Sequence, residues 1–294
     1  MIKKVSLEKL NSYLSQNIQK IHNKSKGSES IKHLSPLYAG GYPMSLLFAP
    51  RMKGEVDKID GIYYSDYDIY FEETAQAEEA VKILTEYALE ENYTSENATT
   101  LKVKFPSDPE GTYETFQIVH KVSGSPESIL PTFDFVNCAV AFAPSSNAFY
   151  MHKEAPKCHS DRILDILNPW MVTDALKTGT PIQDNVIIQL LRFKKYCHRW
   201  EYCLSDKSFD LLIKAYEAFP DIIVPANHPI RVRGGAYSGQ EYYAWRNQNL
   251  WKAVASLVGS HKAWEKYEDQ IGYITSALPE QSVREELTTS QIPF

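Results

Sequence analysis

The chain has 294 residues, 43% of them hydrophobic and 23% charged, a composition typical of a globular protein with one large or two ordinary domains. Its formal net charge of −6 excludes a general attraction to polyanions, so any contact with nucleic acid requires a local basic patch. The longest apolar runs are too short to span a membrane, and the first residues lack a signal-peptide core. We therefore expect a cytoplasmic protein with no membrane partner.

The first segment has a basic bias, with seven Lys against two Glu in residues 1–35. Five aliphatic residues recur there at steps of three and four, which predicts an amphipathic helix with Ser6 at its capping position. They are Leu7, Leu10, Leu14, Ile18 and Ile21. The Lys-rich side of this helix is either a solvated surface or a contact for RNA or an acidic partner.

A glycine pair, Gly40-Gly41, precedes an apolar stretch over residues 42–48 that we expect to begin a helix. Glycine lets the backbone approach a phosphate closely, and a helix N-terminus favours anions. Gly40 and Gly41 are therefore candidate phosphate ligands, and Ser45 is the nearest hydroxyl.

Residues 62–71 are rich in aromatic and β-branched side chains, which predicts a strand. Asp66 and Asp68 lie two positions apart in it, so they point to the same side with Cα atoms about 7 Å apart. Two such carboxylates can converge on Mg²⁺, which proteins commonly hold with one or two carboxylates plus substrate phosphates. The alternative is a surface strand with two solvated carboxylates.

The next segments predict a helix and a hairpin. A helix is expected over 74–89, with Thr74 as its cap and acidic residues in its first turn. Alternating strands over 101–105 and 112–121 form the hairpin, and a short capped turn over 125–131 follows. In the second strand four residues share one face: Tyr113, Thr115, Gln117 and Val119.

A strongly apolar run over residues 133–142 predicts a further strand, with Asp134 near its start. A lone carboxylate in apolar surroundings is unfavourable unless it is paired or bound to a metal. The sequence therefore indicates a third acidic residue on a later strand.

A glycine pair, a D-x-D strand and a later strand with a third Asp together resemble the DNA polymerase β-like nucleotidyltransferase superfamily. The similarity is to its small phage- and bacteria-type members, which have a Ser-Asp-x-Asp-Ile/Leu-x-Phe strand and a Phe-Asp-Phe strand. It covers roughly residues 35–145. Tyr42 replaces the Ser of the usual Gly-Gly-Ser, and a charged loop over 51–60 lengthens the spacing to Asp66.

The resemblance implies an α+β fold, with a mixed sheet that carries helices on one face and an α-helical lobe after it. Residues 1–148 would form the catalytic domain, including the N-terminal amphipathic helix, and residues 149–294 the helical one.

The implied activity is transfer of a nucleoside monophosphate from a nucleoside triphosphate to an acceptor hydroxyl, with release of pyrophosphate. Asp66, Asp68 and Asp134 would hold two Mg²⁺ ions, for which Mn²⁺ is a substitute. Ser65 joins Gly40, Gly41 and Ser45 as a nucleotide-binding candidate. The expected acceptor is an RNA or tRNA 3′ end. A protein hydroxyl, as in antitoxin-type members, and a degenerate non-catalytic nucleotide-binding module remain open alternatives.

Helical patterns predominate after about residue 145, over 161–168, 184–200, 208–219 and 241–258. Within the second of these, Arg192, Lys195 and Arg199 share one face. The run resembles the Arg-x-x-Lys-Tyr helix that follows the catalytic core in template-independent nucleotidyltransferases. That resemblance implies that Arg192 or Lys195 neutralises phosphate charge, and the alternative is an ordinary basic surface.

The four cysteines form no C-x-x-C pair, which favours free thiols over a disulfide framework. They are Cys138, Cys158, Cys197 and Cys203. A zinc site made by the last three with His159 and His198 stays open, although the spacing matches no tight template.

Overall fold

The computed structural model describes residues 1–10, 16, 18, 19, 22, 25–53, 66–89, 93–110, 112–179, 192, 193, 196 and 202–219. The chain divides into two compact units, Met1–Lys157 and Cys158–Phe294. None of the helices in the described ranges has both the length and the apolar character needed to cross a membrane.

The first unit is built on an eight-stranded sheet with the order β1-β8-β7-β2-β3-β6-β5-β4. The β3–β6 pair is parallel and the other neighbouring pairs are antiparallel, so the sheet is mixed. The strands are β1 (Ile2–Ser6), β2 (Leu37–Ala39), β3 (Tyr67–Tyr70), β4 (Tyr93–Thr94), β5 (Ala98–Val103), β6 (Glu114–Val119), β7 (Val140–Ala143) and β8 (Ala148–His152). The expected α+β class with a mixed sheet is confirmed, as is the β5–β6 hairpin.

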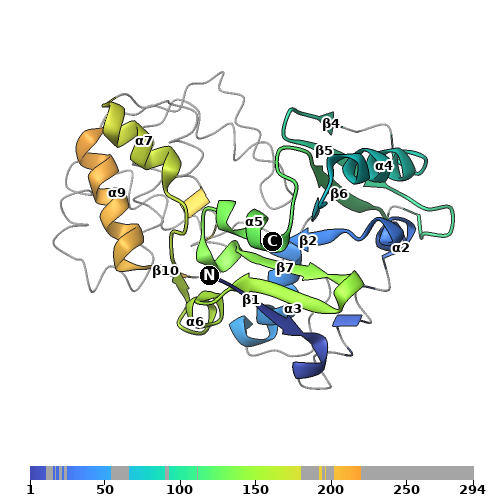
Figure 1. Ribbon diagram of the computed structural model, residues 1–294, viewed down its shortest axis with the longest axis horizontal. Coiled ribbons are helices and arrows are strands. Elements are labelled where there is room, and N and C mark those ends of the chain that lie inside the picture. Colours follow the sequence, from blue (N-terminus) through green and yellow to red (C-terminus); the bar gives the residue numbers. More distant parts are fainter. Residues whose placement is uncertain are drawn as a thin grey trace. The chain divides into compact units, whose positions relative to one another are not determined.

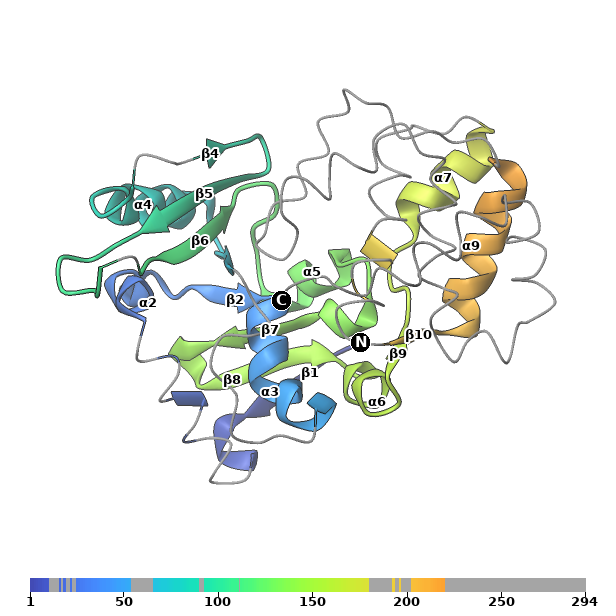
Figure 2. The same cartoon turned by 180° about the vertical axis from the view of Figure 1, so that it is seen from behind.

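One side of the sheet, called the helix face below, carries buried residues from alternate positions along five neighbouring strands. They are Tyr38, Phe142, Tyr67, Ile69, Phe116, Ile118 and Leu101. Helix α3 (Gly41–Lys53) packs there through the Tyr42 ring, whose centroid lies 5.7 Å from that of Tyr38 and 4.8 Å from that of Tyr67. Helix α3 contacts β2, β7 and β3 as well as the 3-10 turn Val136–Cys138, and Figure 2 shows it crossing the β7 side of the sheet.

Helix α4 (Thr74–Thr85) covers the β5 and β6 part of the helix face with its buried residues Ala77, Ala80 and Leu84. Figure 1 shows it beside these two strands. The predicted helix is confirmed, but the prediction of Thr74 as its cap is wrong. Glu73, not Thr74, is the N-cap, because its side chain accepts from the N–H of Gln76 while the Gln76 side chain accepts from the N–H of Glu73.

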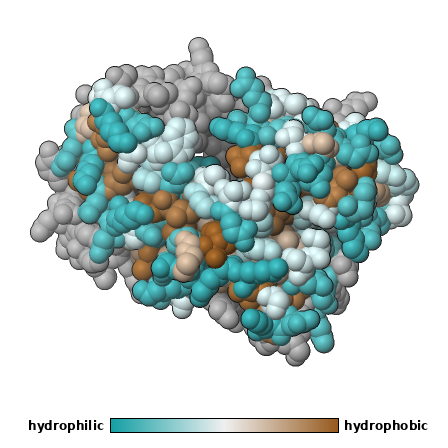
Figure 3. Space-filling model, viewed as in Figure 1, coloured by the Kyte–Doolittle hydropathy of each residue, from teal (hydrophilic) through white to brown (hydrophobic). Residues whose placement is uncertain are grey.

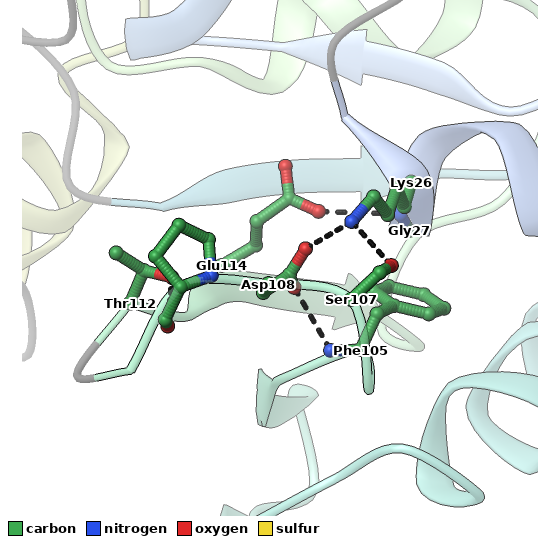
Figure 4. A network of polar contacts seen from close by, with 8 residues as sticks. Lys26, Gly27, Phe105, Ser107, Asp108, Thr112 and Glu114 are labelled. Carbon is green, nitrogen blue, oxygen red and sulfur yellow. Dashed lines mark hydrogen bonds and ion pairs between the residues drawn. The ribbon is translucent and has the colours of Figure 1, made fainter.

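The short helix α2 (Lys26–Ser30) is tied to the β5–β6 hairpin by the contacts drawn in Figure 4. Lys26 Nζ donates to Ser107 Oγ at 2.7 Å and to Asp108 Oδ1, which holds the pKa of Asp108 below its usual value. The N–H of Gly27 donates to Glu114 Oε2 at 3.2 Å. These contacts hold α2 on the hairpin at the helix face of the sheet.

The N-terminal prediction is partly wrong. Residues 2–6 form strand β1 paired with β8, and Leu7–Lys9 is a 3-10 turn, so no helix starts after Ser6. Helical backbone is found at residues 16, 18, 19 and 22, and the rest of the predicted helix lies outside the described residues. Pairing with β8 decides the structure of residues 2–6, because tertiary partners override a weak local propensity.

The apolar run over 133–142 is also not a continuous strand, since β7 begins only at Val140. Before it lie the short helix α5 (Pro126–Ile129) and two 3-10 turns, Leu130–Thr132 and Val136–Cys138. Asp134 lies in the bend between these turns. An apolar run alone does not distinguish a buried strand from a buried turn, which is why the prediction failed.

In the second unit, α7 (Trp170–Thr178) and α9 (Asp206–Ala218) pack together, and β9 (Ile163–Leu164) pairs in parallel with β10 (Cys203–Leu204). Helix α6 (Ala155–Ser160) spans the boundary between the units. The predicted helix over 208–219 is confirmed by α9, whereas 161–168 contains β9 and is not a helix. The helix predicted over 241–258 lies outside the described residues.

The predicted domain boundary at 148/149 lies at the start of β8, a strand of the first unit's sheet. The assignment of the two units as catalytic and helical domains stays a prediction.

Candidate functional site

One row of directly opposed residues crosses all eight strands on the side of the sheet opposite the helix face. Opposed residues of paired strands point to the same side, so this row defines a surface that we call the aspartate face. In order, the row is Lys4, Tyr150, Ala141, Ala39, Asp68, Gln117, Thr100 and Tyr93. Asp68 occupies its centre.

Gly40 and Asp68 lie against each other on this face. Gly40 follows β2 with φ +78°, a conformation that favours glycine, and a Cβ built on it would stand 3.3 Å from Asp68 Oδ2. The same Cβ would lie 3.6 Å from Cε1 of Phe133. The absence of a side chain at Gly40 therefore leaves the space into which the Asp68 carboxylate reaches.

Helix α3 begins immediately after this glycine, as the sequence predicts. The N–H of Met44 donates to the carbonyl of Gly40 at 3.2 Å, so the helix ladder starts there. The first N–H groups of a helix have no partner within it and carry partial positive charge. Because Asp68 lies close to Gly40, a carboxylate and an anion-favouring helix terminus are beside the same turn.

Ser45 lies inside this helix rather than at its open end. Its Oγ donates to the carbonyl of Gly41 at 2.8 Å, and the residue is 5% exposed. That hydrogen bond is the i−4 back-bond that Ser commonly makes within helices. The Ser45 hydroxyl is therefore bonded within the helix and not presented at its open end.

Asp66 is half-exposed and directly precedes β3, one residue before Tyr67. Asp68 is also half-exposed, which separates it from the buried Tyr67 and Ile69 on the helix face. The predicted alternation is therefore confirmed for β3, with the acidic residue on the opposite side from the apolar ones. Ser65 lies outside the described residues.

Asp134 is buried, with 6% of its surface exposed, and follows Phe133, the residue that contacts the Gly40 turn. Its part in a three-carboxylate site stays a prediction. Within the described ranges, no three His, Cys, Asp or Glu side chains gather in a group suited to hold a metal.

The residues around Gly40 suit a hard cation, although they do not form a complete cage. Mg²⁺ keeps several waters and needs only one or two protein carboxylates when substrate phosphates supply further oxygens. Asp68 is a half-exposed oxygen donor beside a turn without a side chain, which fits that kind of site, and Asp66, two residues before it, is also half-exposed.

Gln117 is a further candidate residue, which the sequence alone does not single out. It lies opposite Asp68 on the neighbouring parallel strand β6 and is half-exposed. The alternation of β6 already grouped it with Thr115 on one face. The sequence does not show which strand β6 pairs with. Its pairing with β3 brings that face next to the D-x-D strand.

Buried polar groups support the sheet from the helix face. Glu114 accepts from the N–H of Gly27, and its burial raises the pKa of the carboxyl. Burial likewise raises the pKa of Tyr38. Burial and the nearby positive charge of Lys32 lower the pKa of His22 to about 4. These groups act on the stability of the fold, because they lie on the side opposite Asp68.

The remaining candidates belong to the second unit. Arg192 is helical and half-exposed, and its role at a phosphate stays a prediction, while Lys195 lies outside the described residues. Cys158 is buried and forms no disulfide within the described residues, and His159 Nδ1 lies 2.6 Å from Tyr202 Oη. The zinc hypothesis also involves Cys197 and His198, which lie outside the described residues.

Comparison with known families gives a match to a model described as "Gabija anti-defense 2 family protein", which covers residues 8–162. That span is more than half of the chain and includes Gly40, Asp66, Asp68 and Asp134.

A protein of Bacillus phage SPbetaL7 described as "Gabija anti-defense 2" is 34% identical over 114 residues. The aligned part makes up 36% of this chain and 25% of that protein. The match thus spans about a quarter of the length of the curated relative.

Among solved structures, a CCA-adding enzyme with CTP is 11% identical with a TM-score of 0.48, covering 94% of this chain and 57% of that chain. The Thermotoga maritima CCA-adding enzyme complexed with tRNA is 11% identical with a TM-score of 0.43, covering 99% and 70%. An apo tRNA-processing enzyme is 13% identical with a TM-score of 0.41, covering 97% and 79%. Similarity at this level establishes neither an activity nor a site.

Proposed function

Because the chain belongs to the Gabija anti-defense 2 family, we propose that it acts against the Gabija defence and that it does so as a metal-dependent nucleotidyltransferase. It would transfer a nucleoside monophosphate from a nucleoside triphosphate to an acceptor hydroxyl. The observation that carries the chemical part of this proposal is the 3.3 Å approach of Asp68 Oδ2 to the position of a Cβ on Gly40.

That approach brings together the two binding elements that a metal–triphosphate requires. The N-terminus of α3 favours the negatively charged phosphates, and Gly40 allows them to approach the backbone. Asp66 and Asp68 supply carboxylate oxygens for the divalent cation. Neither element alone is specific, but a nucleotide carries both the phosphates and the bound metal.

Each residue then has a role in the reaction. Asp66 and Asp68 would hold Mg²⁺ or Mn²⁺, which when bound stabilises the attacking and leaving oxygens of an in-line displacement. Gly40 and the first N–H groups of α3 would bind the triphosphate and keep its leaving group oriented. The acceptor oxygen forms a new bond to the α-phosphorus as the bond to pyrophosphate breaks, and the acceptor's proton passes to solvent.

Asp134 would complete the metal ligands of this site. Arg192, in the second unit, is proposed separately as a residue that neutralises phosphate charge. Each is tested by its own substitution, Asp134→Asn and Arg192→Gln.

A second candidate is a nucleotide-binding module without catalysis. It is favoured by one observation, that the strand next to Asp68 presents the amide of Gln117 and not another carboxylate. Such a module would sequester a nucleotide and leave it unchanged. Its expected signature is tight Mg²⁺-dependent nucleotide binding with no release of pyrophosphate.

The test of the proposal is incubation with Mg²⁺, each labelled nucleoside triphosphate in turn, and total RNA with total cell protein. The proposal predicts label in RNA 3′ ends, and label in a protein would instead identify the protein-modifying alternative. In cells carrying Gabija, the wild-type chain is expected to remove protection and Asp68→Asn to leave it intact. If the wild-type chain and Asp68→Asn both remove Gabija protection and no labelled product forms, the binding module is favoured.

A further inference from the structure

The exposed apolar side chains of the described residues are few and scattered. Figure 3 shows hydrophobic residues in separate patches among hydrophilic ones on the face it presents. The large exposed ones are Met1, Leu89, Tyr93, Tyr113 and Trp170. Two of the five, Tyr93 and Tyr113, flank the same strand β5, and both lie on the aspartate face.

The aspartate face continues from Asp68 toward these tyrosines without an apolar interruption. Gln117 on β6 and Thr100 on β5 are half-exposed, and the row ends at the exposed Tyr93 on β4. With neighbouring strands about 4.8 Å apart, Tyr93 lies three strands or roughly 14 Å from Asp68.

A second, parallel row carries a cation and another aromatic ring. Lys102 lies opposite Thr115, and its Nζ is 5.4 Å from the centroid of the Tyr113 ring, which is 51% exposed. Thr115 precedes Phe116, the partner of Tyr67, so it is the β6 residue next to Asp66. This row therefore also starts at the metal-binding candidates.

The direction of these rows matters because of the geometry of in-line displacement. Attacking and leaving oxygens lie on opposite sides of the phosphorus. The Gly40 turn, where the leaving pyrophosphate would bind, belongs to β2 on one side of β3. The side of β6, β5 and β4 is the opposite one, and the acceptor must approach from there.

The residues on that side match a single-stranded nucleic acid. Exposed aromatic rings stack on bases of any sequence, and a lysine beside them neutralises a phosphate. The threonine hydroxyls and the Gln117 amide supply hydrogen bonds for sugar and phosphate oxygens.

We propose that the aspartate face over β6, β5 and β4 binds the single-stranded 3′ end of the acceptor RNA, with Tyr113 and Tyr93 stacking on bases and Lys102 contacting phosphate. This inference rests on the proposed function and assigns its acceptor site to the first unit.

The test is fluorescence anisotropy of the full chain with a labelled ten-nucleotide single-stranded RNA in EDTA, across a series of salt concentrations. Lys102→Ala is expected to weaken binding about tenfold and to reduce the dependence on salt by about one phosphate contact. Tyr113→Leu and Tyr93→Leu are each expected to weaken it by about fivefold or more, because stacking is lost. Lys102→Arg keeps the charge and should retain most of the affinity.

A matched control exists at the other end of the row. Lys4 Nζ lies 5.4 Å from the Tyr150 ring centroid on the same face, but the fully buried Ala39 and Ala141 separate this pair from Asp68. Lys4→Ala and Tyr150→Leu should change the affinity less than twofold. Equal losses in both pairs, unchanged affinity in the Lys102 and Tyr113 variants, or no RNA binding by the wild-type chain would each overturn the inference.

Omitting metal and nucleotide separates this test from that of the proposed function. Selective loss of RNA binding in the Lys102 and Tyr113 variants supports the surface even if no nucleotide is transferred. Transfer by the wild-type chain with unchanged RNA affinity in those variants refutes the surface and leaves the proposed function standing.

Discussion

Asp68 and Gln117 lie directly opposite each other on the parallel strands β3 and β6, in the middle of the row that crosses the sheet. The carboxylate and the amide are both half-exposed and point to the same face. Because neighbouring strands are about 4.8 Å apart, a group bound by Asp68 is within reach of the Gln117 side chain. Gln117 is therefore the residue best placed to tune the proposed metal site.

Replacing the amide by a carboxylate tests that placement. Gln117→Asp adds a further hard oxygen ligand with a negative charge, so we expect Mn²⁺ to bind about tenfold more tightly. Electron paramagnetic resonance titration of free Mn²⁺ measures the affinity. Gln117→Asn, which keeps an amide, is the control and should match the wild-type chain. An affinity of Gln117→Asp no higher than that of Gln117→Asn would show that this side chain does not face the ion.

Gly40 is expected to be sensitive to the smallest side chain. Gly40→Ala introduces a methyl 3.3 Å from Asp68 Oδ2 at φ +78°, so both the backbone and the carboxylate are disturbed. The left-handed conformation alone costs about 1–2 kcal/mol for a non-glycine residue. Nucleotide affinity should fall in addition to thermal stability.

Gly179 provides the control for the backbone effect. It has φ +65° with no atom within 4 Å of its missing Cβ, so Gly179→Ala should lose similar stability without losing nucleotide affinity. Calorimetric titration with a nucleoside triphosphate separates the two. Equal nucleotide affinity in both variants would argue against a role for the Gly40 turn.

Gly27 allows α2 to pack directly on the sheet. A Cβ there would collide with Cζ of the fully buried Phe116, whose ring stacks on that of Tyr67 with a 5.0 Å centroid distance. Gly27→Ala is therefore expected to destabilise the protein by about 1–3 kcal/mol, measured by urea unfolding. In a Phe116→Leu background the same substitution should have a smaller effect. An equal effect in both backgrounds would contradict the close packing.

His22 makes the stability depend on pH. Burial and the charge of Lys32 lower its pKa to about 4 in the folded state, against 6.5 in the unfolded chain. Between these values the unfolded state binds more protons, so stability falls as the pH decreases from 6.5 to 4, by up to about 3 kcal/mol.

His22→Phe removes this titration and keeps a ring against Tyr38 and Phe142, whose centroids lie 5.0 and 5.3 Å away. Between pH 6.5 and 4 the variant should lose less stability than the wild-type chain, even if the variant is the less stable protein at pH 7. Glu114 works in the opposite direction, since its raised pKa favours the folded state at low pH. If the stabilities of the two proteins change with pH in parallel, the pH dependence does not come from a buried His22.

The elements predicted correctly from sequence are those with a strong local signal. The helix after Gly40-Gly41, the helix beginning at Thr74 and the β5–β6 hairpin each follow from a turn residue, a periodicity or an alternation within about fifteen residues. The identity of Asp68 as the acidic residue on the open side of its strand followed in the same way.

Long-range pairing was not predictable from such signals. Strand β1 lacks a strong pattern and is defined by its pairing with β8, which lies more than 140 residues later. Gln117 was not predictable for the same reason, because only the parallel β3–β6 pairing brings it next to Asp68. Asp134 was placed on a strand because its neighbours are apolar, and the 3-10 turns around it satisfy the backbone equally well.

The central claim is that Asp66 and Asp68 bind the metal through which a nucleotide is transferred. The rate of pyrophosphate release with Mg²⁺, total RNA and total cell protein tests it most directly. Asp66→Asn and Asp68→Asn are expected to reduce the rate at least a thousandfold with unchanged thermal unfolding, since each removes a metal ligand from the reacting centre. The exposed Asp210→Asn on α9 should be indistinguishable from the wild-type chain. Near-normal release by both Asp66→Asn and Asp68→Asn, or no release by the wild-type chain with any nucleoside triphosphate, would contradict the claim.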